Sequence, residues 1–476
     1  MAWLSGWAKR RQITIDHNDI DEHLTDFPVL LHLSTNSGIN GADVTSIFDE
    51  VESNSKKIAV TIGDGVTQCY VEVEKWDAIN KEAWLWVKVP SISAIEDTTL
   101  YLYYDNNKPD NIIYVGNPGE TPAQNVWDSN FVLVTHMRDD PDSSHIRDST
   151  SYANNGNKKD SDEPAVTTDG MIDDAQDFDG TDDVVEIPDD DSLDVTSEIT
   201  LEAWIKLDVR PSSIPRHFTI ISKEYTYWML VSQGSDKIQL YISGEVADQY
   251  AYSTTALEAG EWYHIAGTYR ASDGQIRVYI NGVLETDLIR EAGNIRTTVY
   301  PVKIGTLWSN FFDGVIDEVR ISNVIRSAAW IKATYETERD NLLTWGSEET
   351  AGPPPPKKTI LSKGEDAYAL KMSNDGSILY GYINNNEILA TVATPTEWHH
   401  YVLTYDGSNQ KLYIDGVLVN SSSLSGAILT NANNLIIGEY FSGTIDEVRI
   451  YNRALDENTI KQLYWQHRAR KAFKFG

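Results

Sequence analysis

The chain has 476 residues, of which 41% are hydrophobic and 10% aromatic, a content typical of globular domains and a length sufficient for about three of them. Its 39 basic and 72 acidic residues give a formal net charge of -33, which excludes nucleic acid and anionic membrane surfaces as partners because their phosphates are repelled. Cys69 is the single cysteine, so no disulfide forms within the chain, and no apolar run is long enough for membrane insertion.

The N-terminal segment M-A-W-L-S-G-W-A-K-R-R does not have the order of a secretory signal, because its basic residues follow the apolar ones instead of preceding them. We therefore expect a protein made without a cleaved signal peptide. Two destinations stay open: the cytosol, or a site reached by another route, such as assembly into a virus particle.

Up to about residue 117 apolar residues recur with a period of two, which predicts antiparallel strands. The clearest runs contain Ile13 and Ile15, Val71 and Val73, Leu85, Val87 and Val89, and Leu100 and Leu102. In one of these runs Glu72 and Glu74 share a strand face, and we expect that face to meet solvent.

Asp-Gly and Asn-Gly pairs recur along the chain at intervals typical of all-β proteins. They include Asp64-Gly65, Asp179-Gly180, Asp273-Gly274, Asn281-Gly282, Asp375-Gly376, Asp406-Gly407 and Asp415-Gly416. Between alternating runs such pairs predict hairpins, because type I′ turns need a positive φ at both central residues. Helical patterns are few and short, at residues 327–335 and 456–465.

An internal repeat occupies the rest of the chain. The first copy contains T-I-I-S-K from Thr219, W-Y-H-I-A-G-T-Y from Trp262, and G-V-I-D-E-V-R-I-S-N from Gly314; the second contains T-I-L-S-K from Thr359, W-H-H-Y-V-L-T-Y from Trp398, and G-T-I-D-E-V-R-I-Y-N from Gly443. Strand-like sequence precedes the first copy, whereas Gly352 and four prolines precede the second. The second copy therefore lacks its beginning, and we expect its open sheet edges to be covered by another surface.

These observations divide the chain into an N-terminal β module at residues 1–117, a complete repeat at 123–349 and a truncated repeat at 359–466. A proline-rich linker at residues 350–358 is expected to be a semi-rigid polyproline spacer. The end of the chain, residues 467–476, is a basic and aromatic tail, which we interpret as a docking segment. Its candidate contact residues are Arg468, Arg470, Lys471, Phe473, Lys474 and Phe475.

Further motifs of the complete repeat are F-D-G-T-D-D-V-V-E-I-P from Phe178, I-T-L-E-A-W-I-K from Ile199 and Y-I-N-G-V-L from Tyr279. With these motifs the repeat resembles concanavalin A-like domains of the laminin G-like, or pentraxin-like, group. The resemblance implies a two-sheet antiparallel jelly roll, so we expect tandem β-sandwiches with few helices. The first module, from G-W-A-K-R-R-Q-I-T-I-D at Gly6, resembles a module of unknown function that often precedes such domains in phage virion and prokaryotic surface proteins.

No catalytic residue is assigned, because the E-x-D-x-E pattern of glucanases that share this fold is absent. Related domains often bind calcium at the rim of the sandwich, and the resemblance makes Asp179, Asp182 and Asp183 the candidate ligands. The alternative is an ordinary hairpin turn with exposed acids.

Large apolar residues in one loop of each repeat are candidates for glycan or partner contact. They are Trp308, Phe311 and Phe312 in the first copy, and Tyr440 and Phe441 in the second. Packing of the loop over the end of the sandwich is the alternative. The matching residues Trp262 and Trp398 are expected in the cores. In the motif I-D-E-V-R-I we expect surface ion pairs, Glu318 with Arg320 and Glu447 with Arg449.

The favoured hypothesis is a non-enzymatic structural and adhesion protein of a surface assembly, above all a virion, as a capsid decoration or tail fibre. Its partners would be other subunits of that assembly, including further copies of itself, and a cell-surface glycan. The alternative is a soluble carbohydrate-binding protein accessory to polysaccharide degradation, and a glucanase-type enzyme is the third hypothesis.

Overall fold

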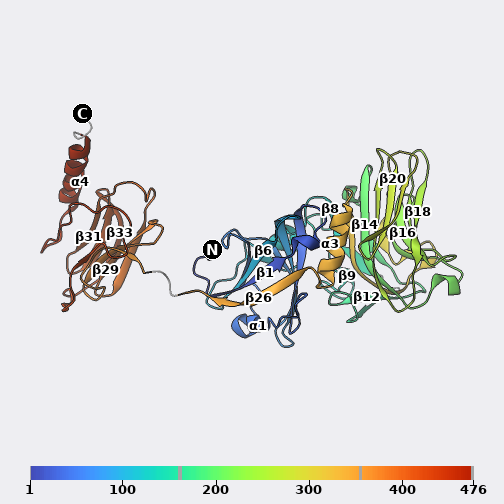
Figure 1. Ribbon diagram of the computed structural model, residues 1–476, viewed down its shortest axis with the longest axis horizontal. Helices are drawn as coiled ribbons and strands as arrows, with labels where there is room; N and C mark the ends of the chain where they lie inside the picture. The colour runs from blue at the N-terminus through green and yellow to red at the C-terminus, as the bar shows by residue number, and fades with distance from the viewer. Residues whose placement is uncertain (1, 159–162, 353–355, 473–476) are drawn as a thin grey trace. The chain divides into compact units, whose positions relative to one another are not determined.

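The computed structural model describes residues 2–158, 163–352 and 356–472 (Figure 1). It divides into two compact units, an N-terminal unit, Met1–Ala351, and a C-terminal unit, Gly352–Gly476. Strands dominate both units, which confirms the all-β prediction. The described part has four α-helices, α1 (Ser46–Val51), α2 (Thr121–Gln124), α3 (Ala328–Glu338) and α4 (Glu457–Ala472), and none of them is both long and apolar enough to cross a membrane.

The first module of the N-terminal unit is a pair of four-stranded sheets. One sheet has the order β26 (Leu343–Thr350), β1 (Lys9–Ile15), β6 (Thr98–Tyr104) and β3 (Ile58–Ile62). The other has the order β2 (Leu24–Leu33), β5 (Glu82–Ile92), β4 (Val71–Asp77) and β7 (Val115–Gly116). The alternating apolar residues of β1, β4, β5 and β6 are buried together in one core, as the period of two predicts.

The second module of the N-terminal unit is a two-sheet antiparallel sandwich. We call one sheet the front sheet; its order is β18 (Gln249–Ala256), β17 (Lys237–Ile242), β16 (Tyr227–Val231), β15 (Phe218–Lys223), β22 (Val302–Ile304), β13 (Val185–Ile187), β10 (Gly156–Lys158) and β9 (His145–Ile146). The back sheet has the order β11 (Ala165–Thr167), β12 (Ala175–Asp179), β25 (Asp313–Ser322), β14 (Glu198–Leu207), β19 (Trp262–Arg270), β20 (Gln275–Ile280) and β21 (Val283–Ile289), and β8 (Phe131–Thr135) also pairs with β25. The inward residues of both sheets share one core, which is the jelly-roll sandwich implied by the sequence motifs.

Two of the predicted hairpin turns have the conformation that a type I′ turn requires. Asn281 and Gly282, between β20 and β21, have φ values of 50° and 74°. Asp415 and Gly416, at the matching place in the second repeat, have φ values of 52° and 79°. Asparagine, aspartate and glycine tolerate this left-handed conformation better than other residues do. The Asn-Gly and Asp-Gly pairs therefore predicted these two turns from the backbone conformation that the turns require.

The predicted boundary at residue 349 is wrong for one strand. After α3, β26 leaves the second module and pairs with β1 of the first module, for example Ile13 opposite Trp345 and Ile15 opposite Leu343. The helix itself contacts the first module, where Phe27 and Trp330 pack edge to face at 4.8 Å. The two modules are thus joined by a shared strand, β26, as well as by side-chain packing.

A buried ionic network lies at the junction between these two modules. On the side of the first module, β4 provides Glu72 and Glu74, whose carboxylates accept 2.6 Å hydrogen bonds from the indole nitrogens of Trp127 and Trp86. On the side of the second module, His136 donates from Nδ1 to Glu318 at 2.7 Å, and the same nitrogen lies 3.4 Å from Glu74. The network therefore connects β4 to β25 through a histidine.

Arg320 continues this network on β25. Its guanidinium pairs with Glu318 and with Glu338 of α3, and it stacks over the Trp86 ring at 4.7 Å. Burial raises the pKa of Glu74 well above its usual range; the charge of His136 opposes this shift, and the charge of Glu318 adds to it. Arg320 is thus shared by two buried acidic side chains, Glu318 and Glu338, and His136 provides a second partner for Glu318.

Two expectations about these residues are wrong for the same reason. Glu72 and Glu74 do share a face of β4, but the second module covers that face and both side chains are buried. Glu318 and Arg320 form a buried pair instead of a surface pair, because the first module covers the outer face of the back sheet. No substrate can reach Glu72 or Glu74, so the glucanase hypothesis has no support from this pair.

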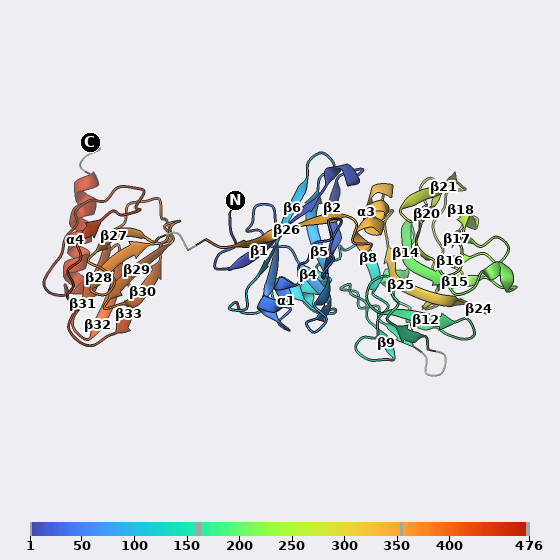
Figure 2. The same cartoon turned by 60° about the horizontal axis from the view of Figure 1, so that its bottom comes forward.

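The C-terminal unit contains two sheets and α4 (Figure 2). The larger sheet has the order β30 (Asn386–Thr391), β29 (Ile378–Ile383), β28 (Tyr368–Met372), β27 (Lys358–Ser362) and β34 (Ile436–Ile437). The smaller has the order β31 (Tyr401–Tyr405), β32 (Asn409–Ile414) and β33 (Val417–Ser423). Within the described part its main hydrophobic cluster has only seven buried residues, so this copy of the fold has a small core.

Trp398 is not a core residue, contrary to the prediction, since 54% of its surface is exposed. In the complete repeat the matching residue, Trp262, is also outside the core, so this prediction is wrong for both residues. Trp262 is half-buried because it lies opposite Lys206 of β14 and near the ring of Trp204. The truncated repeat has no counterpart of β14. The missing strand therefore explains the exposure of this tryptophan.

The ends of the C-terminal unit limit two further interpretations. The first and last residues of the predicted linker belong to strands, because β26 ends at Thr350 and β27 begins at Lys358. Of the residues between these strands, 353–355 lie outside the described part. In the tail, Arg468, Arg470 and Lys471 belong to α4, whereas Phe473, Lys474 and Phe475 lie outside the described residues.

The repeat offers a matched test of the buried arginine. We expect Arg320→Met to destabilise the N-terminal unit by about 3–5 kcal/mol, because it leaves two carboxylates buried without their partner. The same change at the matching position, Arg449→Met, removes an ion pair with Glu447 whose two side chains are both partly exposed, and its effect should stay below about 1 kcal/mol. Urea denaturation of both variants checks this, and equal losses in free energy of unfolding would contradict the assignment.

Candidate functional site

Seven aromatic side chains form a continuous band on the outer face of the front sheet, which we call the aromatic row. Its members are Tyr225, Trp228, Tyr241, Tyr250, Tyr252, Tyr300 and Trp308. Five of them are exposed large hydrophobic residues, a concentration that marks a contact surface in a water-soluble fold.

Strand alternation builds the centre of the row. In β16 the side chains of Tyr227, Met229 and Val231 enter the core, so Trp228 points to the outer face. The pairing register then places Tyr241 of β17 directly opposite Trp228, and Tyr250 of β18 directly opposite Tyr241. Three aromatic rings consequently lie in line across three neighbouring strands.

The planes of the rings in this line are nearly parallel. Trp228 and Tyr241 stack with centroids 3.9 Å apart and an angle of 8° between their planes. Tyr241 and Tyr250 are 6.4 Å apart at 7°, and Tyr252 meets Tyr250 edge to face at 5.9 Å. Such pairs hold one another in position, so the surface that they present is rigid.

Trp308 forms the other end of the row. It lies in the turn between β23 (Thr306–Leu307) and β24 (Asn310–Phe311), and 56% of its surface is exposed. Its ring is 6.0 Å from Trp228 and 6.2 Å from Tyr225, and its indole nitrogen donates to Glu224 at 2.8 Å. The tryptophan is therefore fixed by one hydrogen bond and two ring contacts while its face stays open.

Backbone strain is concentrated at this end of the row. Tyr225 and Trp308 have φ values of 58° and 57°, a left-handed conformation that is rare for bulky residues. Such conformations cost about 1–3 kcal/mol each and persist where the surrounding structure enforces them, often at binding sites. Two strained aromatic residues in contact thus indicate a surface shaped for a ligand.

Polar groups surround the aromatic rings. Tyr241 donates from its hydroxyl to Asp248 at 2.6 Å, and burial together with this carboxylate raises the pKa of Tyr241 to about 12. The guanidinium of Arg290 lies 5.7 Å from the Tyr250 ring. A small cavity of about 30 Å³ beside Trp308 is lined by Ser222, Glu224, Tyr300, Pro301, Lys303 and Leu307 as well. The row therefore combines apolar ring faces with hydrogen-bonding groups at its edges.

A larger hollow, of about 270 Å³, lies between the first module and α3. Its lining residues are Asp19, Ile39, Lys332, Glu336 and Asn341. It contains no aromatic ring and no buried charged cluster, so it offers fewer specific contacts than the aromatic row does.

The predicted contact residues of the two repeats differ in burial, and only some of them are exposed. Trp308 belongs to the aromatic row, and Phe311 is half-buried in the same hairpin. Phe312 is fully buried in the core, where it packs on Phe178 at 6.2 Å, so its predicted contact role is wrong. In the C-terminal unit Tyr440 is exposed and Phe441 packs partly against the core.

Six residues of the row were missed in the sequence because the signal is distributed. Trp228 stands in β16, Tyr241 in β17, and Tyr250 and Tyr252 in β18, so only the pairing register brings these rings together. Tyr225 lies in the turn before β16. A strand pair in which aromatic residues alternate with core residues, as in Q-Y-A-Y from Gln249, is the signal that indicates such a face.

The three candidate calcium ligands do lie close together. Oxygen atoms of Asp179, Asp182 and Asp183 all lie within 4.8 Å of one another. The amide of Asp179 donates to Asp183 at 2.6 Å, and Asp313 lies opposite Asp179 in the strand pairing. Burial, followed by the negative charges of Asp179 and Asp182, raises the pKa of Asp183. Crowded oxygen donors with unfavourable mutual repulsion fit a hard cation such as Ca²⁺.

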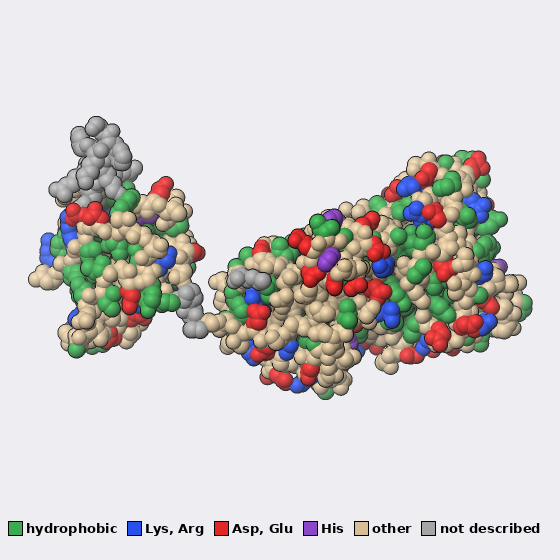
Figure 3. Space-filling view, viewed as in Figure 1, with side chains coloured by type: hydrophobic (Ala, Val, Ile, Leu, Met, Phe, Trp, Pro, Cys, Tyr) green, Lys and Arg blue, Asp and Glu red, His purple; other side chains and the backbone are tan. Residues whose placement is uncertain are grey.

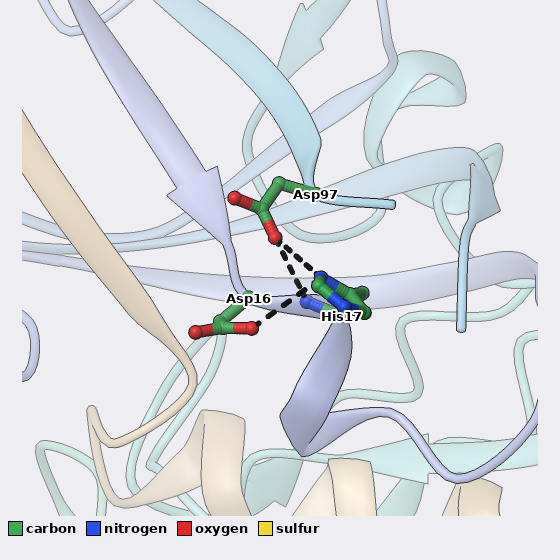
Figure 4. A group of neighbouring side chains, drawn as sticks. All are labelled: Asp16, His17 and Asp97. Carbon is green, nitrogen blue, oxygen red and sulfur yellow. Dashed lines mark hydrogen bonds and ion pairs between the residues drawn. The ribbon is translucent and has the colours of Figure 1, made fainter. Parts of the chain in front are cut away.

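A third charged group lies in the first module, where Asp16, His17 and Asp97 meet (Figure 4). His17 donates from Nδ1 to Asp97 at 2.7 Å, and this hydrogen bond raises the pKa of His17. Asp16 accepts from the amide of Asn18 at the start of a short 3₁₀ turn, η1 (His17–Asp19). These hydrogen bonds stabilise a surface turn, which accounts for the proximity of the three side chains.

The two-sheet antiparallel sandwich that carries the aromatic row is a jelly-roll domain. The family model for the concanavalin A-like lectin/glucanases superfamily matches residues 179–332 and 350–461, more than half of the chain. The chain therefore belongs to the concanavalin A-like lectin/glucanases superfamily. A model for a domain of unknown function, DUF2341, matches residues 54–131, and no curated protein sequence matches the chain.

The chain is similar in fold to several solved structures, of which three are given. The binding domain of Paraclostridial Mosquitocidal Protein 1 is 9% identical, with a TM-score of 0.37, over 60% of this chain and 75% of that one. Domain 4 of AbnA, a GH43 extracellular arabinanase from Geobacillus stearothermophilus, solved with arabinotriose, is 22% identical, with a TM-score of 0.35, over 43% and 97%. A botulinum neurotoxin type C structure is 11% identical, with a TM-score of 0.34, over 64% and 80%. At these scores the similarity carries no argument, and the assignment depends on the family match.

Proposed function

We propose that the N-terminal unit is a carbohydrate-binding module and that its aromatic row is the binding face. The single observation that carries this proposal is the set of five exposed aromatic rings on the outer face of the front sheet, which pack around the buried Trp228. The apolar C–H faces of sugar rings stack on such aromatic faces, while carboxylates and hydroxyls at the edges receive the sugar hydroxyls.

The shape and charge of the face support an extended, uncharged glycan. The row continues from Tyr300 through Trp308 and Trp228 to Tyr252, so several sugar units can contact it at once. A formal net charge of -33 disfavours polyanionic polysaccharides by long-range repulsion. Neutral oligosaccharides are therefore the substrate class for this surface.

Alanine substitutions in the row test this function. On an array of neutral gluco-, xylo-, galacto- and arabino-oligosaccharides we expect binding that Trp308→Ala weakens by about tenfold or more, because one aromatic anchor is lost. Tyr152→Ala, which removes an exposed aromatic residue outside the row, is the matched control and should leave affinity unchanged. Binding that is equal in all three proteins would place the site elsewhere, and no binding to any glycan would end the proposal.

We also propose that Asp179, Asp182 and Asp183 hold a calcium ion that stiffens the rim of the sandwich. A bound ion would neutralise the repulsion that raises the pKa of Asp183. Ca²⁺ at a hundredfold excess over its dissociation constant should add about 2.7 kcal/mol to the stability of the N-terminal unit. Thermal unfolding with and without Ca²⁺ measures this shift, which Asp182→Asn should abolish and Asp97→Asn, in the turn of the first module, should not.

We propose adhesion as the biological role. In this role the protein is part of a surface assembly, above all a virion, and its aromatic row contacts a cell-surface glycan. Tandem modules with one outward face support this role, as does the exposed apolar surface of the C-terminal unit. The alternative is a soluble glycan-binding accessory to polysaccharide degradation. Mass spectrometry of purified particles distinguishes them: we expect the chain at a fixed stoichiometry, and its recovery in the soluble fraction alone would favour the accessory role.

A further inference from the structure

A segment of the C-terminal unit has the sequence of a central strand but forms none. Residues 443–450 read G-T-I-D-E-V-R-I and repeat residues 314–321 of β25. In the second module β25 pairs with β14 on one side and with β12 and β8 on the other. In the described part of the C-terminal unit, no strand is assigned to residues 443–450, because the repeat lacks the counterparts of these neighbours.

The segment nevertheless keeps the local conformation of β25. Glu318 and Glu447 have φ values of 48° and 53°, and each amide is bonded to the preceding aspartate, at 2.8 Å and 2.9 Å. Arg449 pairs with Glu447 just as Arg320 pairs with Glu318. The backbone bulge that accommodates β14 in the complete repeat is thus already formed here.

The edge on the other side of the gap is also available. β31 corresponds to β19, the second neighbour of β14, and it is the terminal strand of its three-stranded sheet. An edge strand presents backbone donors and acceptors that another strand can pair with. By analogy with the complete repeat, the missing strand would lie between β31 and residues 443–450.

Apolar side chains line this position. Val319 and Ile321 of β25 are fully buried, whereas the matching Val448 and Ile450 are 40% and 53% exposed. Figure 3 shows hydrophobic side chains gathered on the visible face of this unit. Exposed apolar residues that repeat buried ones indicate a surface built to be covered.

We propose that one extended strand from another polypeptide inserts between β31 and residues 443–450 and completes this sandwich by β-strand addition. The strand of this chain that fills the equivalent position, β14, is already paired on both sides with β19 and β25. The sequence T-L-E-A-W-I-K occurs once in the printed sequence, so in a second copy of the chain this strand is occupied in the same way. Because β14 is the one segment of the printed sequence with this motif, we assign the occupant to a different protein.

The complete repeat defines the chemistry of that occupant. In β14 the inward residues Leu201, Ala203 and Ile205 are buried, and Glu202 on the other face lies near the charge of Arg320. Arg449 occupies the matching place in the C-terminal unit. The partner strand should therefore alternate apolar residues with polar ones and carry an acidic residue opposite Arg449.

A peptide with the sequence of β14, E-I-T-L-E-A-W-I-K-L, tests the proposal on the full chain. We expect saturable binding that slows hydrogen exchange at residues 401–405 and 443–450 by at least tenfold. A peptide of the same composition without the alternation should not protect these residues. Val448→Asp should abolish the protection, while Val417→Asp, an exposed change on β33 at the far edge of the sheet, should preserve it.

Three results would overturn the proposal. Protection by the scrambled peptide would show non-specific adsorption, and absence of protection at any peptide concentration would show that the position is closed. If sedimentation shows a dimer of the chain alone with residues 401–405 already protected, a second copy is the occupant and a separate partner is wrong.

Discussion

Arg320 is the interaction on which the N-terminal unit depends. It lies between Glu318 and Glu338, out of contact with water, and its neighbours His136 and Trp86 connect it to the carboxylates of β4. A cluster of this kind is stable only when every member keeps its partner. The geometry of the junction between the first and second modules is consequently specified by charge pairing as well as by apolar packing.

The junction determines which surface is left for function. The first module and α3 cover the outer face of the back sheet, where Ile331 of α3 packs on Ala266 and Tyr279. The outer face of the front sheet stays open and carries the aromatic row. One face of the sandwich is therefore used for assembly of the unit and the opposite face for contact. The C-terminal unit has the same helix-on-sheet packing, with Ile460 of α4 against Tyr413, but it lacks the strand that completes its sandwich.

The sequence predicted what depends on local pattern. Alternation identified the strands, Asn281-Gly282 and Asp415-Gly416 identified hairpins, and the repeated motifs implied the jelly roll. Alternation also placed Glu72 and Glu74 on one face correctly. It could not say what covers that face, because burial by another module is a long-range property.

The candidate site was predictable only in part for a similar reason. Trp308 was visible because a loop tryptophan is unusual, whereas Trp228, Tyr241 and Tyr250 become neighbours through strand register. Trp308 faces solvent and Phe312 faces the core. The loop sequence alone does not specify these two orientations. Trp398 shows the converse case, in which a residue that is half-buried in the complete repeat becomes exposed because the neighbouring strand is absent.

The central claim is that the open face of the front sheet binds a glycan through its aromatic row. A crystal structure of the chain soaked with a neutral oligosaccharide tests it most directly. The account predicts sugar rings stacked on the exposed rings of the row, Trp308 and Tyr250, which lie on either side of the buried Trp228. Sugar density at the rim beside Asp179, with the aromatic row unoccupied, would contradict it.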